Sequence, residues 1–346
     1  MMKTFKKIGL DTLNGLSIGI VVALIPGALV NQLVQALLPT WPQLQFILAL
    51  TAFASGLLPA ISAVCVGMTA KLSPIQTSAL ALAAIAGAGN FTMKNGNITV
   101  NGSGDVINIA ITIMIGYGVI LLLGKSLKAY TILLLPLIVL VVAGGIGHLT
   151  LIPVGKITTL IGIGIEHLIG LQPILMGIIM GIIFGLLIVS PISSVGIATA
   201  ISLSGIAAGS ANLGIVGVSF ALAIFGWQVN SFGTSIAHFL GSPKMQMANL
   251  MTNPKLLLPI SINAGILGGL GAIFKIGGTP MSAGFGFSGL IGPLAALANR
   301  PSDFANISLV IILFFILPIA LGLVANYLFN YKLHFFTAED FALNFE

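Results

Sequence analysis

Long apolar runs, almost free of charged side chains, follow one another along the whole chain. Only 6% of the 346 residues are Asp, Glu, Lys or Arg, whereas 57% are hydrophobic, and the mean hydropathy is +1.15. A soluble domain of ordinary composition carries charged residues at about 25%. So few charges cannot cover a water-facing surface, whereas a surface that faces lipid needs almost none. The sequence therefore predicts an all-α polytopic membrane protein.

A membrane-spanning helix needs about 20 mostly apolar residues, and about ten runs meet that requirement. The predicted spans cover residues 13–37, 44–70, 75–92, 105–124, 129–151, 173–190, 194–210, 213–238, 256–275 and 305–330. A shorter, glycine-rich segment over 279–299 is interpreted as a re-entrant hairpin. No polar stretch is long enough to fold alone, so we expect a single transport-type membrane domain over residues 1–346.

The lysine positions indicate an orientation, because cytoplasmic loops carry an excess of Lys and Arg. The lysines that fall on the predicted cytoplasmic side are Lys3, Lys6, Lys7, Lys71, Lys125 and Lys128. We therefore expect residues 1–12 in the cytoplasm, followed by a first span that is retained rather than cleaved as a signal peptide. The asparagine-rich loop around Lys94 falls outside. An even number of spans returns the tail, residues 331–346, to the cytoplasm.

The segment "KITTLIGIGIEHLIGL", residues 156–171, is short and polar at its ends. One interpretation is an amphipathic helix at the membrane interface, which would expose Glu166 and His167. The other is an inward-facing acid–imidazole pair that handles protons, since ionisable groups inside membranes are often functional. Both interpretations are open at the level of the sequence.

Glycine and proline residues occur in the middle of several predicted spans. Gly177, Gly181 and Gly185 recur every four residues, a spacing that predicts close packing of helix backbones. Other positions predict broken helices: Pro26-Gly27 followed by Asn31, Pro191 with its neighbouring serines, and the segment "GGTPMSAGFGFSGLIGP". Discontinuous helices of this kind mark the solute sites of secondary transporters. The two proline breaks lie about half a chain apart, which suggests a weak two-half repeat.

Four stretches resemble one family of membrane proteins. They are "GSGDVINIAITIMIGYG" (102–118), "SPISSVGIATAISLSGIAAGSANLG" (190–214), "SFGTSIAHFLGSPKMQMANLMTNP" (231–254) and "GGTPMSAGFGFSGLIGP" (277–293). The family is the integral-membrane IIC-type (EIIC) component of sugar phosphotransferase systems, in the branch with the perfringolysin-regulator-like proteins. The resemblance implies a transporter fold, a small polar, sugar-like solute, dimerisation and a separate EIIB-type partner protein.

The chain departs from that family in two respects. No IIB-like domain is present, and the lone cysteine, Cys65, lies in an apolar run, so it cannot carry a phosphocysteine. The Gly-Ile-Thr-Glu-Pro-type loop of the glucose-class components is also missing. Phosphotransfer would therefore need separate proteins, and we expect no enzymatic activity in this chain.

The stretch "GAGNFTMKNGNITVNGSGDVINIAI" carries Asp105, the only acidic residue between Asp11 and Glu166. Asp105 follows a glycine-rich turn at the start of a span, where an Asp can cap the helix. Asn108 lies on the same face at i+3. The alternative is that this carboxylate and carboxamide point into a cavity and bind the hydroxyl groups of a solute. A buried carboxyl group would also allow a proton-coupled role.

Two further clusters complete the candidate solute site. Asn230, Thr234 and His238 recur at i, i+4 and i+8, which predicts one polar stripe on a helix, and Trp227 beside it could stack on a sugar ring. Thr279 and Ser282 lie in a loop with many backbone donors. The predicted substrate-binding residues are Asn31, Asp105, Asn108, Ser193, Ser194, Trp227, Asn230, Thr234, His238, Thr279 and Ser282.

The sequence thus predicts a transporter that moves a small, carbohydrate-like solute by alternating access. A membrane-embedded regulator descended from such a transporter, and an ion-coupled carrier without phosphotransfer, are the alternatives. The scattered basic residues argue against nucleic acid as a partner. The single cysteine excludes a disulfide framework, and no His, Cys, Asp or Glu set has metal-ligand spacing, so neither metal nor cofactor is expected.

Overall fold

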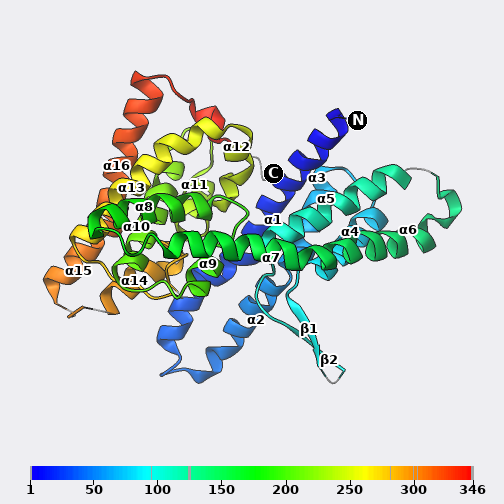
Figure 1. The fold of residues 1–346 in the computed structure, drawn as a ribbon, viewed down its shortest axis with the longest axis horizontal. Coiled ribbons are helices and arrows are strands. Elements are labelled where there is room, and N and C mark those ends of the chain that lie inside the picture. Colours follow the sequence, from blue (N-terminus) through cyan, green and yellow to red (C-terminus); the bar gives the residue numbers. More distant parts are fainter. Residues whose placement is uncertain are drawn as a thin grey trace. The chain divides into compact units, whose positions relative to one another are not determined.

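The computed structural model describes residues 2–94, 96–123, 126–280, 282–298, 300–301 and 303–343. Within these ranges the chain is helical apart from one two-stranded hairpin and several irregular segments (Figure 1). It divides into two compact units, each described here by itself. Unit 1 comprises Met1–Gly27 and Val34–Ile157, and unit 2 comprises Ala28–Leu33 and Thr158–Glu346. The single transport domain over residues 1–346 stays a prediction.

Unit 1 contains most of the first half of the chain. Its elements are α1 (Met2–Leu37), η1 (Pro42–Leu44), α2 (Gln45–Gly56), α3 (Leu58–Thr69), α4 (Pro74–Gly87), β1 (Phe91–Lys94), β2 (Asn97–Val100), α5 (Val106–Leu123), η2 (Lys128–Tyr130), α6 (Thr131–Val139), the π-helical turn η3 (Leu140–Gly144) and α7 (Gly145–Glu166). Two of these helices contribute to both units: residues 28–33 of α1 and residues 158–166 of α7 belong to unit 2.

Unit 2 contains the remaining helices. Its elements are α8 (Pro173–Ile188), α9 (Ser194–Ala200), α10 (Gly205–Phe225), α11 (Phe232–Leu240), η4 (Pro243–Gln246), α12 (Met247–Thr252), η5 (Pro254–Leu256), α13 (Leu257–Ile273), η6 (Ser288–Leu290), α14 (Ile291–Ala298), α15 (Phe304–Ile311), the π-helical turn η7 (Ile312–Ile316), α16 (Leu317–Asn326), the π-helical turn η8 (Tyr327–Lys332) and η9 (Ala338–Phe341).

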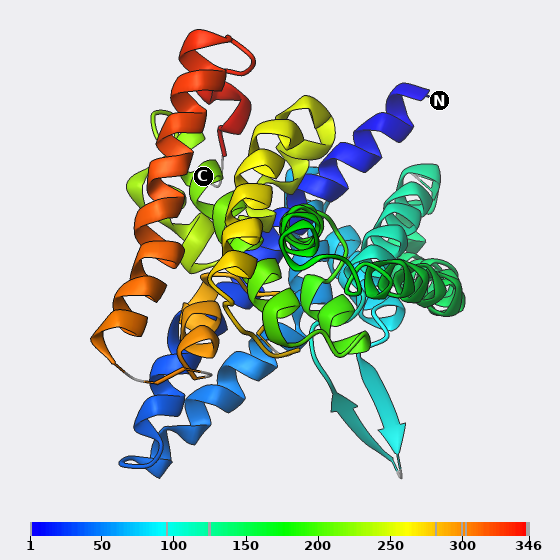
Figure 2. The same ribbon diagram turned by 60° about the vertical axis from the view of Figure 1, so that its left-hand side comes forward.

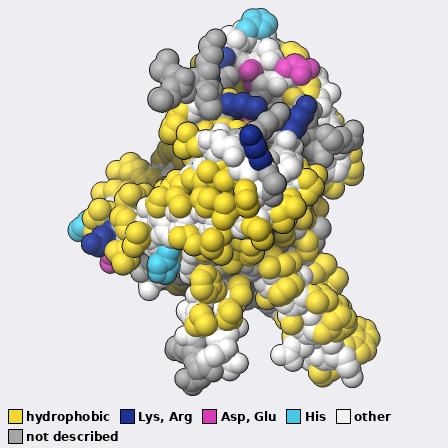
Figure 3. Space-filling view, turned by 90° about the vertical axis from the view of Figure 1, so that its right-hand side faces the viewer, with side chains coloured by type: hydrophobic (Ala, Val, Ile, Leu, Met, Phe, Trp, Pro, Cys, Tyr) yellow, Lys and Arg dark blue, Asp and Glu magenta, His cyan; other side chains and the backbone are white. Residues whose placement is uncertain are grey.

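The helices have the length and apolarity that a membrane fold requires. Among the described residues, six helices are long and apolar enough to span a bilayer, and the pair η1–α2 and α3, bent by 52°, makes a seventh possible span. Three shorter apolar helices cover Pro74–Gly87, Pro173–Ile188 and Ser288–Ala298. The face seen in Figure 3 is covered mainly by hydrophobic side chains, with charged side chains gathered in a few places. The chain is an all-α polytopic membrane protein, as predicted.

Three of the sequence-based boundaries are wrong. The predicted break at Pro26 is absent, because α1 continues through this proline as one helix; a membrane helix tolerates the loss of one N–H group. The predicted span over 194–210 is interrupted after Ala200, where Ser202 and Gly205 both adopt a positive φ. The predicted span over 213–238 corresponds to α10, which ends at Phe225.

The segment 156–171 is not a separate helix in its first part. Residues 156–166 are the last part of α7, and α6, η3 and α7 together form one helix of 36 residues, Thr131–Glu166. At 1.5 Å per residue this helix is about 54 Å long, whereas the hydrocarbon core is about 30 Å thick. Glu166 and His167 are both exposed, and the choice between the interfacial helix and the inward-facing pair stays a prediction.

In unit 1, α4 is the central helix and packs against α3, α5, α6 and η3. Its start is defined by a capping box, in which Ser73 and Gln76 bond to each other's backbone N–H groups. The Tyr117 hydroxyl donates to Asp11 at 3.0 Å, which joins the first turns of α1 to the last turns of α5. Lys6 and Lys7 lie in the first turns of α1, Lys128 begins η2, and Lys125 lies outside the described residues, so the cytoplasmic orientation stays a prediction.

The hairpin of β1 and β2 projects away from the helices of unit 1 (Figures 1 and 2). Phe91 pairs with Val100 and Lys94 with Asn97 in antiparallel register. At its base, the buried Asn90 amide donates to the carbonyl oxygens of Gly56 and Gly102, at 2.9 and 3.1 Å. Hydrogen bonds to the backbone thus fix the position where the hairpin leaves the helices.

In unit 2, α8, α10 and α13 form a closely packed central block. A Cβ atom added at Gly181 would overlap the carbonyl oxygen of Ala264, and one added at Gly214 would overlap that of Gly181. Gly268 stands in the same relation to Gly177. Only glycine allows backbones to approach so closely, so the packing predicted from the four-residue glycine spacing is confirmed.

Candidate functional site

Three segments that depart from α-helical structure lie within unit 2, and buried side chains connect them. They are residues 189–193 between α8 and α9, residues 241–246 after α11, and residues 277–290 after α13. We call the buried set Ser194, Asn212, Lys244, Ser282 and Ser288 the polar junction. All five side chains are 6% exposed or less.

The polar junction ties each segment to another by side-chain hydrogen bonds to backbone. Ser194 Oγ donates to the Gly284 carbonyl at 2.8 Å, which links the start of α9 to residues 277–290. Ser288 Oγ donates to the Gly241 carbonyl, which links residues 277–290 to the end of α11. Lys244 Nζ donates to the carbonyl oxygens of Ser190 and Ile192, the latter at 2.9 Å. Irregular backbone is tolerated at membrane depth only where protein or a water-filled cavity covers it.

Asn212 holds the middle of the segment 277–290 from the central helix α10. Its Oδ1 accepts from the Gly286 N–H at 3.0 Å, and its Nδ2 lies 3.5 Å from Ser282 Oγ. Gly286 has a φ of +62°, a conformation that favours glycine. A Cβ atom at Gly284 would overlap the backbone of Val195. Two glycines therefore allow the segment to lie directly on α10 and α9.

The predicted serine and threonine residues take specific roles here. Ser193 is the N-cap of α9, because its Oγ accepts from the Gly196 N–H at 3.0 Å. Thr279 and Ser282 bond reciprocally: Ser282 Oγ accepts from the Thr279 N–H at 2.9 Å, and Thr279 Oγ1 from the Ser282 N–H at 3.2 Å. Ser194 and Ser282 are buried in the junction, whereas Ser193 and Thr279 are exposed beside it.

His238 lies next to the junction on α11 and is fully buried. Its Nδ1 is 3.0 Å from the carbonyl oxygens of Thr234 and Ser235, and its Nε2 is 3.3 Å from Gln246 Nε2. These partners assign the proton to Nδ1 and leave Nε2 as an acceptor for the Gln246 amide. Burial lowers the pKa of His238 to about 4, so the ring is neutral at physiological pH.

The predicted stripe of Asn230, Thr234 and His238 forms only in part. Thr234 and His238 lie one turn apart on α11, but Asn230 precedes the helix, whose N-cap is Ser231. The Asn230 amide instead bonds to the segment that follows η8: its Nδ2 donates to the Phe341 carbonyl at 2.9 Å. Its Oδ1 accepts from the Leu343 N–H at 2.9 Å.

Asn230 belongs to a set of carboxamides that bind the segment 338–343. Gln246 Nε2 donates to the Phe341 carbonyl at 2.8 Å, and Asn249 Nδ2 donates to the Ala342 carbonyl at 2.9 Å. Phe341 itself is buried against Phe225. Figures 1 and 2 show this last part of the chain folding back from η8 into unit 2. The side chains of Asn230, Gln246 and Asn249 therefore hold the backbone of residues 341–343 in place.

Trp227 and Asn31 lie outside the polar junction. The Trp227 indole is 50% exposed and packs edge to face on Phe232, with 5.8 Å between ring centroids. Asn31 is half-buried on α1, within the stretch 28–33. Sugar stacking by Trp227 stays a prediction.

Asp105 and Asn108 belong to unit 1. Asp105 Oδ1 accepts from the Asn108 N–H at 2.9 Å and caps α5. The fully buried Asn108 Nδ2 donates to the carbonyl oxygens of Gly87 and Gly147, at 2.5 and 2.7 Å, and its Oδ1 accepts from Thr150 Oγ1 at 2.7 Å. Both side chains thus have structural partners, and solute binding by them stays a prediction.

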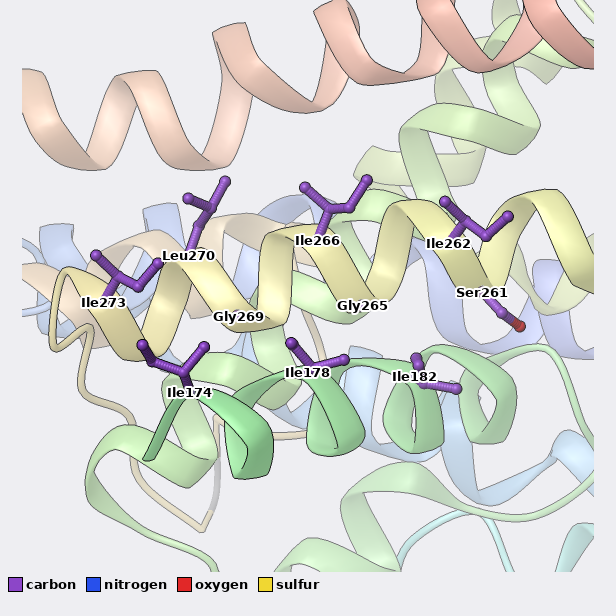
Figure 4. Close-up of a pocket in the computed structure, with 10 residues that line it drawn as sticks. All are labelled: Ile174, Ile178, Ile182, Ser261, Ile262, Gly265, Ile266, Gly269, Leu270 and Ile273. Atoms are coloured by element: carbon purple, nitrogen blue, oxygen red, sulfur yellow. The ribbon is translucent and has the colours of Figure 1, made fainter. Parts of the chain in front are cut away.

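A groove between α8 and α13 offers a contrasting environment (Figure 4). It has a volume of about 360 Å³ and is lined by isoleucines of both helices, among them Ile174, Ile178 and Ile266. Gly265 and Gly269 of α13 also line it. The hydroxyl of its one polar side chain, Ser261, already donates to the Leu257 carbonyl at 2.7 Å. The groove therefore suits lipid or apolar contacts and not a polar solute.

Sequence reasoning missed three members of the junction: Asn212, Lys244 and Ser288. A signal for Lys244 existed, because it is a lone charged residue inside a stretch that resembled the IIC-type family. For Asn212 the sequence carried no such signal, since a single polar residue in an apolar helix usually serves packing. Ser288 lies in the same glycine-rich segment as Ser282, which was a signal for it. Among the described residues, no three His, Cys, Asp or Glu side chains gather as a metal site would require.

Comparison with known proteins gives one match. The family model described as "Phosphotransferase system, EIIC" matches residues 10–343, which is nearly the whole chain. No curated protein and no solved structure matches.

Proposed function

Because the chain belongs to the EIIC family of the phosphotransferase system, a family of membrane transporters, we propose that it moves a small, carbohydrate-like solute across the cell membrane by alternating access. The polar junction is the observation that carries this proposal. It collects buried hydroxyl, amide and ammonium groups and backbone from three segments of unit 2 that depart from α-helical structure. Transporter sites are typically built from such discontinuous helices.

The solute site that we propose lies at the polar junction and His238. Ser194, Ser282 and the carboxamide of Asn212 offer both donors and acceptors, as the hydroxyl groups of a sugar require. Ser193 and Thr279 are exposed on two of these segments, where a solute would first make contact, and the half-buried Thr234 of α11 is proposed to bind beside His238. Asn31, Trp227 and Asn230 are proposed as peripheral contacts. Solute binding by Asp105 and Asn108 stays a prediction, which uptake by Asp105→Asn and Asn108→Ala tests.

Phosphorylation of the solute would require separate EIIB- and EIIA-type proteins, which the family pairs with EIIC components. We also propose a homodimer with both termini in the cytoplasm. These points rest on the family and on the positive-inside distribution of lysines.

The experiment is uptake by purified protein in proteoliposomes, screened against sugars, sugar acids and polyols. We expect saturable uptake or binding of at least one solute, and its loss by about tenfold in Ser282→Ala, equivalent to one lost hydrogen bond. Ser261→Ala is the matched control, because it removes a hydroxyl at the apolar groove of the same unit.

If no solute in the panel binds while the protein is folded, the transport proposal is rejected. Altered transcription with normal solute uptake in cells that lack the protein would instead favour the regulator. Uptake that needs an added EIIB-type protein would show phosphotransfer coupling. Uptake without such a protein would indicate a stand-alone carrier.

A further inference from the structure

Lys244 is a buried cation at the point where α8 is broken. Its side chain is 6% exposed, and its Nζ donates to three main-chain carbonyl oxygens: those of Ser190, Ile192 at 2.9 Å and Leu187 at 3.4 Å. These carbonyls belong to the last turn of α8 and to the segment around Pro191. The three donors of an ammonium group are thus all engaged by one stretch of irregular backbone.

The surroundings of Lys244 contain few groups that can titrate. Between Glu166 and Asp303 the sequence has no Asp or Glu, so α8 to α12 supply no carboxylate. His238 on α11 is the only other titratable group of these elements, and η9 adds Glu339 and Asp340. Glu339 is exposed, and the Asp340 carboxylate accepts from the Thr337 N–H and from Asn253 Nδ2.

A lysine is an unusual choice for this position. Burying an ammonium ion without a paired carboxylate is strongly unfavourable, whereas the amide of an asparagine would offer two donors without a charge. The dipole of α8 offsets part of that cost, because its negative end faces Nζ. Burial lowers the pKa of Lys244 to about 7, so both protonation states are accessible near physiological pH.

We propose that Lys244 is a positioning residue that holds the Pro191 break in the observed conformation when charged and releases it when neutral, so that its protonation controls solute movement through the polar junction. On release one Nζ–H bond breaks, the electron pair stays on nitrogen and the proton passes to water. The neutral amine keeps two donors for three carbonyls. The role in transport rests on the proposed function; the local release does not.

The first test measures the backbone directly. Hydrogen–deuterium exchange of peptides covering residues 187–197, corrected for intrinsic rates, is compared at about pH 5.5 and about pH 8.5, on either side of the titration. We expect protection to fall by about tenfold at the higher pH in the wild type, the equivalent of one lost hydrogen bond to a charged group. The interior of α8, residues 176–185, is the internal control.

Two variants sharpen this test. In Lys244→Arg the guanidinium stays charged, so protection should be high at both pH values. In Lys244→Met, which has no donor for these carbonyls, protection should be low at both pH values. Wild-type protection that is the same at both pH values overturns the proposal, as does full protection in Lys244→Met. If Lys244→Met does not fold, the comparison of the wild type and Lys244→Arg at the two pH values still tests the proposal.

Transport is the second readout. With the solute found by the proteoliposome screen, wild-type uptake should change across the same pH range. Uptake by Lys244→Arg should be slower by about tenfold and independent of pH, because the charged guanidinium keeps the segment around Pro191 in its observed conformation. If exchange of residues 187–197 depends on pH but no assay detects uptake, the proposed function is rejected, whereas the release of the Pro191 segment by neutral Lys244 stands. Unaltered, pH-dependent uptake in Lys244→Arg would reject the role of Lys244 in transport.

Discussion

Two fully buried asparagines, Asn108 in unit 1 and Asn212 in unit 2, use the same chemistry for different ends. Asn108 joins the backbones of two regular helices, at Gly87 on α4 and Gly147 on α7. Asn212 reaches from a regular helix to irregular backbone, at Gly286 and Ser282. The two asparagines therefore differ in what they stabilise. A buried amide between regular helices stabilises packing, whereas one that holds irregular backbone maintains a shape which helices alone cannot provide.

Alanine at each of these asparagines tests the comparison and should give the largest effects. Asn108→Ala removes the hydrogen bonds to the carbonyls of Gly87 and Gly147, of which the Gly147 carbonyl still accepts from Thr150 Oγ1. The loss should cost about 1–3 kcal/mol and lower the variant's thermal unfolding midpoint in detergent. Its uptake per folded molecule should stay within about twofold of the wild type. Asn212→Ala leaves the Gly286 N–H unpaired and should reduce uptake by about tenfold.

The two variants serve as controls for each other, since both remove a fully buried carboxamide. A strong loss of uptake in stable Asn108→Ala protein would contradict the division between the units. Normal uptake in Asn212→Ala would remove the polar junction from the proposed solute site.

We expect an effect of intermediate size from His238, on the pH dependence of the free energy of unfolding. Burial lowers its pKa to about 4 from the ordinary 6.5. Between these values the unfolded chain binds a proton that the folded protein does not, so the free energy of unfolding should fall as the pH falls from about 6.5 to about 4. The difference in stability between the wild type and His238→Gln should change over this range. Ser261→Ala, which leaves His238 in place, should run parallel to the wild type.

The smallest effect is expected from Asp105→Asn. Asp105 and Asp303 are both helix N-caps, of α5 and α15, and each accepts from the backbone N–H three residues later, at 2.9 and 2.8 Å. An asparagine oxygen preserves both caps, so either variant should change stability and uptake by less than about twofold. A tenfold loss of uptake in Asp105→Asn alone would bring unit 1 into the solute site.

The membrane class and most spans follow from the sequence because lipid imposes a simple requirement: about 20 apolar residues for each crossing. That requirement does not show where a helix stops inside an apolar run. The α10 helix ends at Phe225, and Asn230 bonds to Phe341, a residue 111 positions later, so the end of the helix depends on a distant contact. Pro26 and Pro191 illustrate the same limit, since only the second interrupts its helix.

The candidate site followed the same pattern. Ser193, Ser194 and Ser282 could be predicted because they flank a proline or glycine break, where backbone groups need side-chain partners. The predicted stripe of Asn230, Thr234 and His238 assumed one continuous helix, but Ser231 restarts the helix as its N-cap. Lys244 could not be assigned a partner from the sequence, since its partners are carbonyl groups that every residue carries.

The glycine contacts between α8, α10 and α13 have a mechanical consequence. Backbones that touch directly leave no layer of side chains whose rotamers could adapt, so these three helices resist sliding or rotating against one another. A conformational cycle in unit 2 would then carry them as one rigid body. The strain of the cycle would concentrate at the segments that leave this body, residues 189–204 and 277–290. The glycines would thus determine which parts of the transporter act as hinges.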